Sequence, residues 1–323
     1  MSTSLKPERV VACRCELGES PTWHAESSAL YWSDIARHEL HRFRPDTAEH
    51  SIVLKGTLVS GISIEQDGAL LLLGRWGAIG RFTDNRISWL RRCNANQYGY
   101  RFNDCIADPQ GRLYAGIMGY EMGMGLPRIG RFARKCLQRA RIVHRADERV
   151  GKLCVLSSRC QIRELDRNMG RPNGMGFSSD LRTLYVTDSA RRQILAYPYH
   201  IETGSLGPSR VAVAVSASGV PDGLAIDEDG CLWSAQHRGG AVIRYAPDGQ
   251  EIGRISVPSS RVTSLTFAGP DNSDLYLTSA RSAEKHDVYG GDLFRIQTGT
   301  KGGPVWKSNL TGSSVTTRSS REV

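Results

Sequence analysis

The segment Pro221-Asp222-Gly223-Leu224-Ala225-Ile226-Asp227-Glu228-Asp229-Gly230-Cys231-Leu232-Trp233 contains one unit of a repeating pattern. It begins with a polar motif, continues through a polar turn at Asp229-Gly230, and ends in an apolar-aromatic strand at Leu232-Trp233. The same order follows three other motifs: Gly18-Glu19-Ser20-Pro21, Arg101-Phe102-Asn103-Asp104 and Arg171-Pro172-Asn173-Gly174. Polar residues that recur at one point of a repeat lie around one axis when the repeats close into a ring. The pattern therefore predicts a site on such an axis.

Six strand marks give the length of the repeat. They are separated by 41, 42, 71, 48 and 43 residues, and they are Tyr31, Leu72, Tyr114, Tyr185, Trp233 and Tyr276. A period in the low forties with several strands per unit is typical of a β-propeller blade. The sequence thus predicts an all-β protein, a six-bladed β-propeller. The long step of 71 residues predicts an insertion, which we assign to the basic stretch 127–149, before a strand-like segment at 152–156.

Six blades use most of the 323 residues, so the sequence predicts a single propeller domain over residues 1–310. Turn pairs such as Asp67-Gly68 and Asp248-Gly249 fit tight connections between strands, where glycine adopts positive φ without a Cβ clash. Residues 311–323 are polar and rich in Ser, Thr and Arg, and they predict a disordered tail.

Composition narrows the setting. Hydrophobic residues make up 40% and charged residues 23%, as in ordinary globular proteins. No apolar run approaches the length of a membrane span, and the first residues show no signal-peptide pattern. The eight cysteines form no Cys-x-x-Cys pair, which favours reduced thiols in a cytoplasmic protein. We also expect no contact with a membrane.

The net charge of +9 raises the question of nucleic acid. The arginines are spread over many turns, and the basic stretch 127–149 lacks the interleaved aromatic residues of a stacking platform. We therefore expect no nucleic-acid partner. The stretch is either a solvated loop or a contact for an acidic partner or an anionic substrate. The sequence leaves the oligomeric state open.

The motifs bring together oxygen donors. Glu19 and Asp222 supply carboxylates and Asn173 supplies an amide carbonyl, a set that suits one divalent cation such as Ca²⁺, Mg²⁺ or Mn²⁺, while Zn²⁺ also accepts it. A cation in an open site polarises a carbonyl and lowers the pKa of a bound water. Such a site hydrolyses esters and lactones without a nucleophilic serine, and the chain contains no Gly-x-Ser-x-Gly elbow.

The ordered series of motifs resembles the regucalcin/gluconolactonase family, also called the senescence-marker-protein family. The resemblance runs from about Cys15 to Arg295, and it rests on Gly18-Glu19-Ser20-Pro21-Thr22-Trp23, Leu30-Tyr31-Trp32-Ser33-Asp34-Ile35, Arg101-Phe102-Asn103-Asp104, Arg171-Pro172-Asn173-Gly174, Tyr185-Val186-Thr187-Asp188-Ser189 and Pro221-Asp222-Gly223-Leu224. It implies a six-bladed propeller with a single metal site on the central axis. It also implies metal-dependent hydrolysis of a small sugar lactone to the aldonic acid.

The resemblance further implies roles for individual residues. Glu19, Asn173 and Asp222 match the metal ligands, and Asp222 doubles as the general base or positions the attacking water. Arg101, Asn103 and Glu121 match the residues that bind the substrate. Two departures stand out: Cys105 replaces the family's glycine after Asn-Asp, and the 127–149 insertion is longer than usual.

Structural interpretations of the same residues remain open at this point. Glu19 can cap a turn, and Asn173-Gly174 and Asp222-Gly223 are common turn pairs. Arg101 can form a surface ion pair. The alternative functions are a related propeller hydrolase of aryl esters or organophosphates, and a non-catalytic metal-binding propeller.

Overall fold

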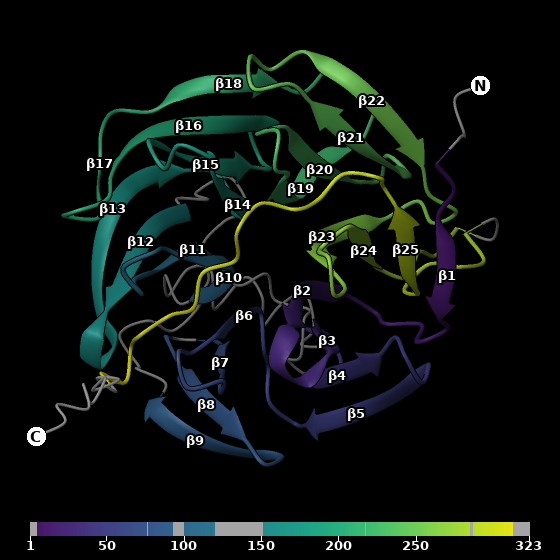
Figure 1. Cartoon of the computed structure of the whole chain (residues 1–323), viewed down its shortest axis with the longest axis horizontal. Helices are drawn as coiled ribbons and strands as arrows, with labels where there is room; N and C mark the ends of the chain where they lie inside the picture. The colour runs from purple at the N-terminus through teal and green to yellow at the C-terminus, as the bar shows by residue number, and fades with distance from the viewer. Residues whose placement is uncertain are drawn as a thin grey trace, which may run out of the picture.

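The protein is a ring of six antiparallel sheets around a central axis (Figure 1). The computed structural model describes residues 5–75, 77–92, 100–119, 151–216, 218–284 and 287–312. Named from the innermost strand outward, the first sheet contains β2 (Gly18–His24), β3 (Ala29–Asp34), β4 (Glu39–Arg44) and β5 (Glu49–Lys55). The second sheet contains β6 (Gly61–Ile64), β7 (Leu70–Leu73), β8 (Ile79–Thr83) and β9 (Arg86–Arg91). The third contains β10 (Tyr100–Ala107), β11 (Leu113–Gly119), β12 (Gly151–Ser157) and β13 (Gln161–Met169). We call these sheets blades 1 to 3.

Blades 4 to 6 complete the ring. They are β14 (Pro172–Phe177), β15 (Thr183–Asp188) and β16 (Gln193–His200), with β17 (Ser205–Leu206) and β18 (Arg210–Ala214) both paired to β16; β19 (Val220–Ile226), β20 (Leu232–His237), β21 (Ala241–Tyr245) and β22 (Glu251–Ser256); and β23 (Val262–Ala268), β24 (Asp274–Ser279), β25 (Leu293–Gln297) and β1 (Glu8–Val11). Two short 3₁₀ turns, η1 (Ala25–Ser27) and η3 (Ser158–Cys160), join strands.

The predicted six-bladed propeller is confirmed. Each of the six strand marks lies on the second strand of its own blade, from Tyr31 on β3 to Tyr276 on β24. The extra length in the 71-residue step falls between β11 and β12, the second and third strands of blade 3. The insertion 127–149 itself lies outside the described residues. No helix in the described part of the chain is long and apolar enough to cross a membrane.

The ring is closed by the first strand. β1 pairs antiparallel with β25, so that Glu8 lies opposite Arg295 and Val11 opposite Leu293. Blade 6 therefore combines three strands from the C-terminal part of the chain with one from the N-terminal part (Figure 1). The hydrogen bonds between β1 and β25 therefore join the two ends of the chain within one sheet. As a result, the ring has no gap between its first and last strands.

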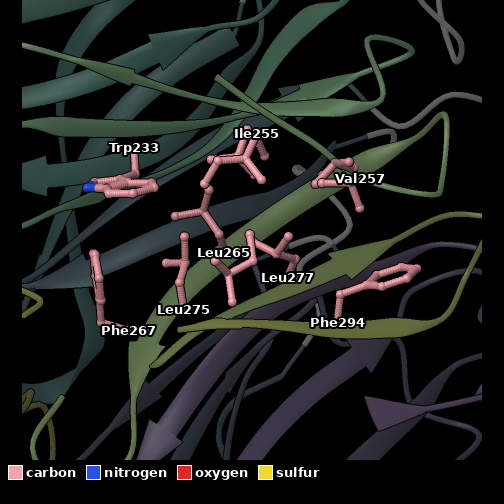
Figure 2. Packing of buried hydrophobic residues seen from close by; sticks show 12 residues of the cluster. Trp233, Ile255, Val257, Leu265, Phe267, Leu275, Leu277 and Phe294 are labelled. Carbon is pink, nitrogen blue, oxygen red and sulfur yellow. The ribbon is translucent and has the colours of Figure 1, made fainter. Parts of the chain in front are cut away.

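The hydrophobic core lies between neighbouring blades. The described residues form six buried clusters, one for each contact between consecutive blades. In the cluster of Figure 2, Trp233 and Ile255 of blade 5 face Leu265, Leu275 and Phe294 of blade 6. Burial of alternating apolar side chains on both faces of each sheet thus positions the blades around the axis.

Truncation of Phe294 tests this packing. The ring of Phe294 is fully buried on β25, which also carries the closing strand. We expect Phe294→Ala to lower the free energy of unfolding by about 3–5 kcal/mol, because it removes a large apolar side chain and leaves a cavity. Urea unfolding measures the effect. The exposed Val305→Ala variant is the control, and a loss below about 1 kcal/mol for Phe294→Ala would contradict the assignment.

The C-terminal segment closes one end of the central channel. Past β25 the chain crosses the ring, shown in yellow in Figure 1, and binds the far ends of the inner strands. Gly303 donates to the carbonyl of Ile226, Ser308 donates to that of Ile64, and Thr311 donates to the Glu65 carboxylate. We call residues 302–311 the strap. Residues 313–323, most of the predicted tail, lie outside the described part of the chain.

Candidate metal and substrate site

The innermost strands begin at the end of the channel opposite the strap. Five of them have a register shift within their first residues: between Glu19 and Thr22, Phe102 and Cys105, Pro172 and Met175, Pro221 and Leu224, and Val262 and Ser264. A bulge bends a strand locally and redirects its side chains. The predicted site residues Glu19, Asn103, Asn173 and Asp222 all lie at these bulges. β6 pairs regularly, and it supplies no predicted site residue.

The glycines after Asn173 and Asp222 have a packing role. Neither Gly174 nor Gly223 has positive φ, and both lie within strands. A Cβ on Gly174 would lie 2.0 Å from the backbone nitrogen of Leu224, and one on Gly223 would lie 2.5 Å from Cα of Ser264. The alternative that these are turn pairs is therefore wrong. Glycine is needed because neighbouring inner strands approach closely at the axis.

Asn173 and Asp222 are in direct contact across two blades. The amide Nδ2 of Asn173 donates to Oδ1 of Asp222 and, at 3.2 Å, to Oγ of Ser189. Both side chains are buried, with 6% and 7% of their surface exposed. Burial raises the pKa of Asp222 to about 7, against the lowering effect of the Arg171 and Arg101 guanidinium groups. Asp222 is thus a carboxyl group that changes protonation near neutral pH.

Glu19 and Asp104 complete an acidic group around Asp222. Burial, reinforced by the charges of Asp222 and Asp104, raises the pKa of Glu19 well above its usual range. Burial also raises the pKa of Asp104, to about 6. Three carboxyl groups from blades 1, 3 and 5 therefore repel one another electrostatically at the axis.

Asp104 was not predicted as a site residue. The motif Arg101-Phe102-Asn103-Asp104 contains it, but only Arg101 and Asn103 were assigned roles from the sequence. Its charge acts on both Glu19 and Asp222, which places it within the electrostatic environment of the site. The motif contains Asp104, but its role becomes evident only from the bulge between Phe102 and Cys105, which is a feature of strand pairing.

Arg101 and Asn103 are both engaged in hydrogen bonds with the protein. Nη1 of Arg101 donates to Oδ1 of Asn103 at 2.6 Å and to the carbonyl of Phe102 at 2.8 Å. Nδ2 of Asn103 donates to the carbonyl of Pro172 at 2.8 Å, which links blade 3 to blade 4. Arg101 is buried, with 5% of its surface exposed. The pair therefore shapes the channel wall next to Asn173.

The donor set fits a hard divalent cation. Among the described residues, no three His, Cys, Asp or Glu side chains are grouped closely enough to hold a metal ion, so a third ligand has to come from the amide of Asn173. Asn173 presents its nitrogen to Asp222, and rotation of the amide by 180° presents the oxygen instead. The raised pKa values of Glu19 and Asp222 also reflect negative charge that a cation would neutralise.

Of two further sequence features, Cys105 can be placed and Glu121 cannot. Cys105 continues β10 with negative φ and its Sγ donates to the carbonyl of Ile62 at 3.5 Å, so the replacement of glycine leaves the strand intact. Glu121, the third predicted substrate-binding residue, lies outside the described residues. Its role therefore stays a prediction.

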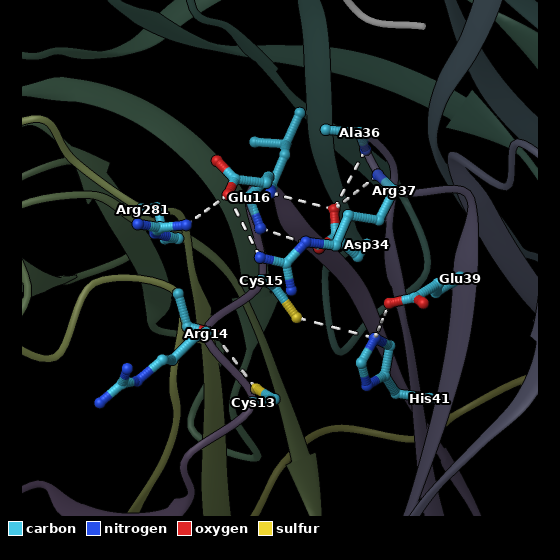
Figure 3. A network of polar contacts seen from close by, with 12 residues as sticks. Cys13, Arg14, Cys15, Glu16, Asp34, Ala36, Arg37, Glu39, His41 and Arg281 are labelled. Atoms are coloured by element: carbon cyan, nitrogen blue, oxygen red, sulfur yellow. Dashed lines mark hydrogen bonds and ion pairs between the residues drawn. The ribbon is translucent and has the colours of Figure 1, made fainter.

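The loops around the site are held by buried aspartates. In Figure 3, Asp34 accepts hydrogen bonds from the backbone amides of Glu16, Ala36 and Arg37. Asp188 accepts from those of Gly170 and Arg171 in the same way. Through these contacts both aspartates stabilise turns. The Arg171 backbone is fixed two residues before Asn173.

The strap covers the end of the channel that lies behind the site. A cavity of about 160 Å³ runs along the axis from Asp104 and Cys105 to Pro304 and Trp306 of the strap. The strap thus covers the far end, and the acidic group faces the opposite end of the ring.

Fold and site together define a six-bladed β-propeller with a carboxylate-amide site at one end of its axis. Residues 17–281 match the SMP-30/Gluconolactonase/LRE-like region, and the chain belongs to this family. This confirms the family resemblance expected from the motifs.

Individual relatives support the same assignment. The chain is 35% identical to pentonolactonase XacC of Haloferax volcanii over 314 residues, which cover 94% of this chain and 98% of that protein. A luciferin-regenerating enzyme superposes with a TM-score of 0.81 at 24% identity, covering 95% of this chain and all of the other. Regucalcin from Agrobacterium tumefaciens, described as a calcium-binding protein, superposes with a TM-score of 0.79 at 24% identity, with 95% and 98% coverage.

Replacement of Arg101 is expected to affect both substrate and structure. As a predicted substrate-binding residue, Arg101 would donate charge-assisted hydrogen bonds to the substrate, each worth about 1.5–3 kcal/mol. Arg101→Ala removes them, so we expect kcat/KM to fall by about 10–100-fold. It also leaves the Phe102 carbonyl and Oδ1 of Asn103 without this donor, so the melting temperature should fall. Steady-state kinetics with calorimetry test this. Unchanged kinetics with a lowered melting temperature would reduce Arg101 to a structural role.

Proposed function

We propose that this protein hydrolyses a sugar lactone to the corresponding aldonic acid with one divalent cation bound by Glu19, Asn173 and Asp222. The observation that carries the proposal is the contact between Asn173 and Asp222 at the channel axis, inside a group of carboxyls with raised pKa. Membership of the family and the 35% identity to a pentonolactonase support the same reaction.

The cation is Ca²⁺, Mg²⁺, Mn²⁺ or Zn²⁺, since carboxylate and amide oxygens suit all four. When bound, a divalent cation here supplies Lewis acidity, which polarises the lactone carbonyl and acidifies water. The calcium-binding neighbour shares only 24% identity and bears on the fold alone. The choice among the ions therefore rests on the donor set of this chain.

Asp222 moves the proton in the proposed reaction. Of the two carboxylate oxygens of Asp222, one would hold the cation together with the rotated amide of Asn173, and the other accepts a proton from the attacking water. The water oxygen adds to the carbonyl carbon, and the bond from that carbon to the ring oxygen then breaks. The ring oxygen takes the proton that Asp222 received from the water and leaves as a hydroxyl group.

The remaining residues orient the sugar. Arg101 and Asn103 line the wall between blades 3 and 4 and are proposed to bind sugar hydroxyls, together with Glu121. Asp104, below them, keeps negative charge at the axis and strengthens the attraction for a cation. Fixed orientation of the ring places its carbonyl next to Asp222 and raises the rate of attack.

A panel of aldonolactones tests the proposal. The chelator-treated protein is assayed by acid release with each of the four ions restored in turn. We expect turnover of at least one aldonolactone that depends on added metal. Phenyl acetate and paraoxon are the comparison substrates. Faster turnover of either than of every lactone would favour an aryl esterase or organophosphate hydrolase, and no metal-dependent turnover at all would favour a non-catalytic metal-binding propeller.

A further inference from the structure

The amide of Asn173 has a second polar neighbour, Ser189. Its Nδ2 donates to Oγ of Ser189 at 3.2 Å as well as to Oδ1 of Asp222. Ser189 is 4% exposed, and it ends the motif Tyr185-Val186-Thr187-Asp188-Ser189. Among the described residues its hydroxyl makes no other hydrogen bond. The proton of that hydroxyl is therefore available to an acceptor at the Asn173 amide.

The backbone around Asn173 is fixed on both sides. Before it, the carbonyl of Pro172 accepts the hydrogen bond from Asn103. After it, a Cβ on Gly174 would lie 2.0 Å from the backbone nitrogen of Leu224. The strand therefore cannot shift far without disturbing its contacts with blades 3 and 5. The remaining freedom lies in the side chain, where rotation of the amide exchanges its nitrogen and its oxygen.

The backbone of Ser189 is fixed to the same part of blade 4. Its amide donates to the carbonyl of Arg171 at 3.0 Å, and its carbonyl accepts from the amide of Arg192 at 3.3 Å. The preceding residue, Asp188, lies opposite Pro172 in the ladder between β14 and β15. The hydroxyl of Ser189 therefore stays within reach of the Asn173 side chain whichever way the amide is turned.

The two partners of the amide respond differently to its rotation. With the nitrogen toward them, as in the structure, both Ser189 and Asp222 accept a hydrogen bond. Rotation brings the oxygen of Asn173 to the same place, where an ionised Asp222 carboxylate has no proton to donate. The Ser189 hydroxyl can donate instead of accept, because a hydroxyl carries one proton and two lone pairs. Ser189 thus stabilises either orientation, whereas Asp222 favours the nitrogen unless a cation lies between the two oxygens.

We propose that Ser189 is a positioning residue of the metal site, whose hydroxyl donates to Oδ1 of Asn173 and holds this oxygen toward the cation. The inference rests on the proposed function, which takes Asn173 as a ligand. A carbonyl oxygen has two lone pairs, so one accepts from Ser189 while the other faces the cation. Partners of metal ligands fix the orientation of those ligands, and their loss typically lowers metal affinity by about 10–100-fold.

Calorimetric titration of the chelator-treated protein with Ca²⁺ and with Mn²⁺, in the absence of lactone, tests this role. For the ion that the unchanged protein binds more tightly, we expect Ser189→Ala to weaken binding by about tenfold or more. Ser189→Thr keeps the hydroxyl and should bind within about threefold of the unchanged protein. Ser88→Ala is the matched control, since Ser88 is exposed on β9 and its replacement should leave the affinity unchanged. If Ser189→Ala fails to fold, Ser189→Cys takes its place, because a thiol is a weaker donor and should also weaken binding.

Asn173→Asp separates positioning of the amide from a purely structural role. A carboxylate presents an oxygen in either orientation, so adding Ser189→Ala to Asn173→Asp should cost about threefold or less in metal affinity. An equal loss in both backgrounds, or unchanged metal affinity in Ser189→Ala whatever its melting temperature, would overturn the role of Ser189 while metal-dependent lactone turnover upholds the proposed function. Absence of metal binding by the unchanged protein would overturn the proposed ligands and the role of Ser189 together.

Discussion

Asp222→Asn is expected to lower kcat/KM for the best lactone by about 10³-fold or more while the protein stays folded. The variant loses a proposed metal ligand and the proposed base together, and loss of a general base alone costs about 10²–10⁴-fold. In the metal-free state the melting temperature should stay the same or rise. The neutral amide avoids the burial of charge that raises the pKa of Asp222, and it can still accept the hydrogen bond from Asn173.

The two readouts of this experiment separate catalysis from folding. Kinetics gives the loss of activity, and calorimetry of the chelator-treated protein gives the melting temperature. Asp180→Asn is the control, because Asp180 is an exposed aspartate at the strap end of blade 4. Near-normal lactone turnover by Asp222→Asn would remove Asp222 from both proposed roles. A large loss of melting temperature would mean that the carboxylate stabilises the ring.

Removal of the divalent cation is expected to abolish turnover and to lower the melting temperature more at about pH 8 than at about pH 5.5. In the metal-free protein the pKa of Asp222 is raised from an ordinary value near 4 to about 7. The stability contributed by such a group is fully present below its ordinary pKa and is lost as the pH rises through its folded value. A bound cation compensates the charge that appears, so its stabilising effect grows with pH.

Calorimetry at both pH values, with chelator and with restored Ca²⁺ or Mn²⁺, measures this effect. In Asp222→Asn the difference between the two pH values should shrink, because the group that titrates near 7 is gone. Equal stabilisation by metal at both pH values in the unchanged protein would disprove the link between the cation and the buried carboxyls. Full turnover in chelator, with no metal bound, would disprove the proposed metal dependence.

The repeat could be read from the sequence because each blade marks its second strand in the same way. An aromatic or leucine residue follows a polar turn at nearly constant spacing, and residues such as Tyr31, Tyr114 and Trp233 lie at equivalent places in the structure. Alternation and turn chemistry act locally, so they are visible in a single sequence. The blade that departs from the spacing is the one with an insertion between its second and third strands.

The site was harder to predict because its geometry depends on contacts between blades. Asn173-Gly174 has the composition of a turn, yet the glycine is required by the neighbouring inner strand at Leu224. The bulge that directs Asp104 toward Glu19 and Asp222 is likewise invisible in the sequence pattern. The hydrogen bond from Asn103 to the carbonyl of Pro172 could not be foreseen either, since it joins residues 69 positions apart.

The shared sixth blade has a consequence for biosynthesis. Trp32 and Phe43 of blade 1 are covered by Tyr276 and Leu293 of blade 6, which are translated near the end of the chain. At about 5–20 residues per second, this apolar face stays uncovered for roughly a quarter of a minute to a minute on the ribosome. Such a face is a target for chaperones and for aggregation throughout that time. Glu19 likewise comes near Asp222 only when the ring closes, so a nascent chain lacks the complete set of proposed metal ligands.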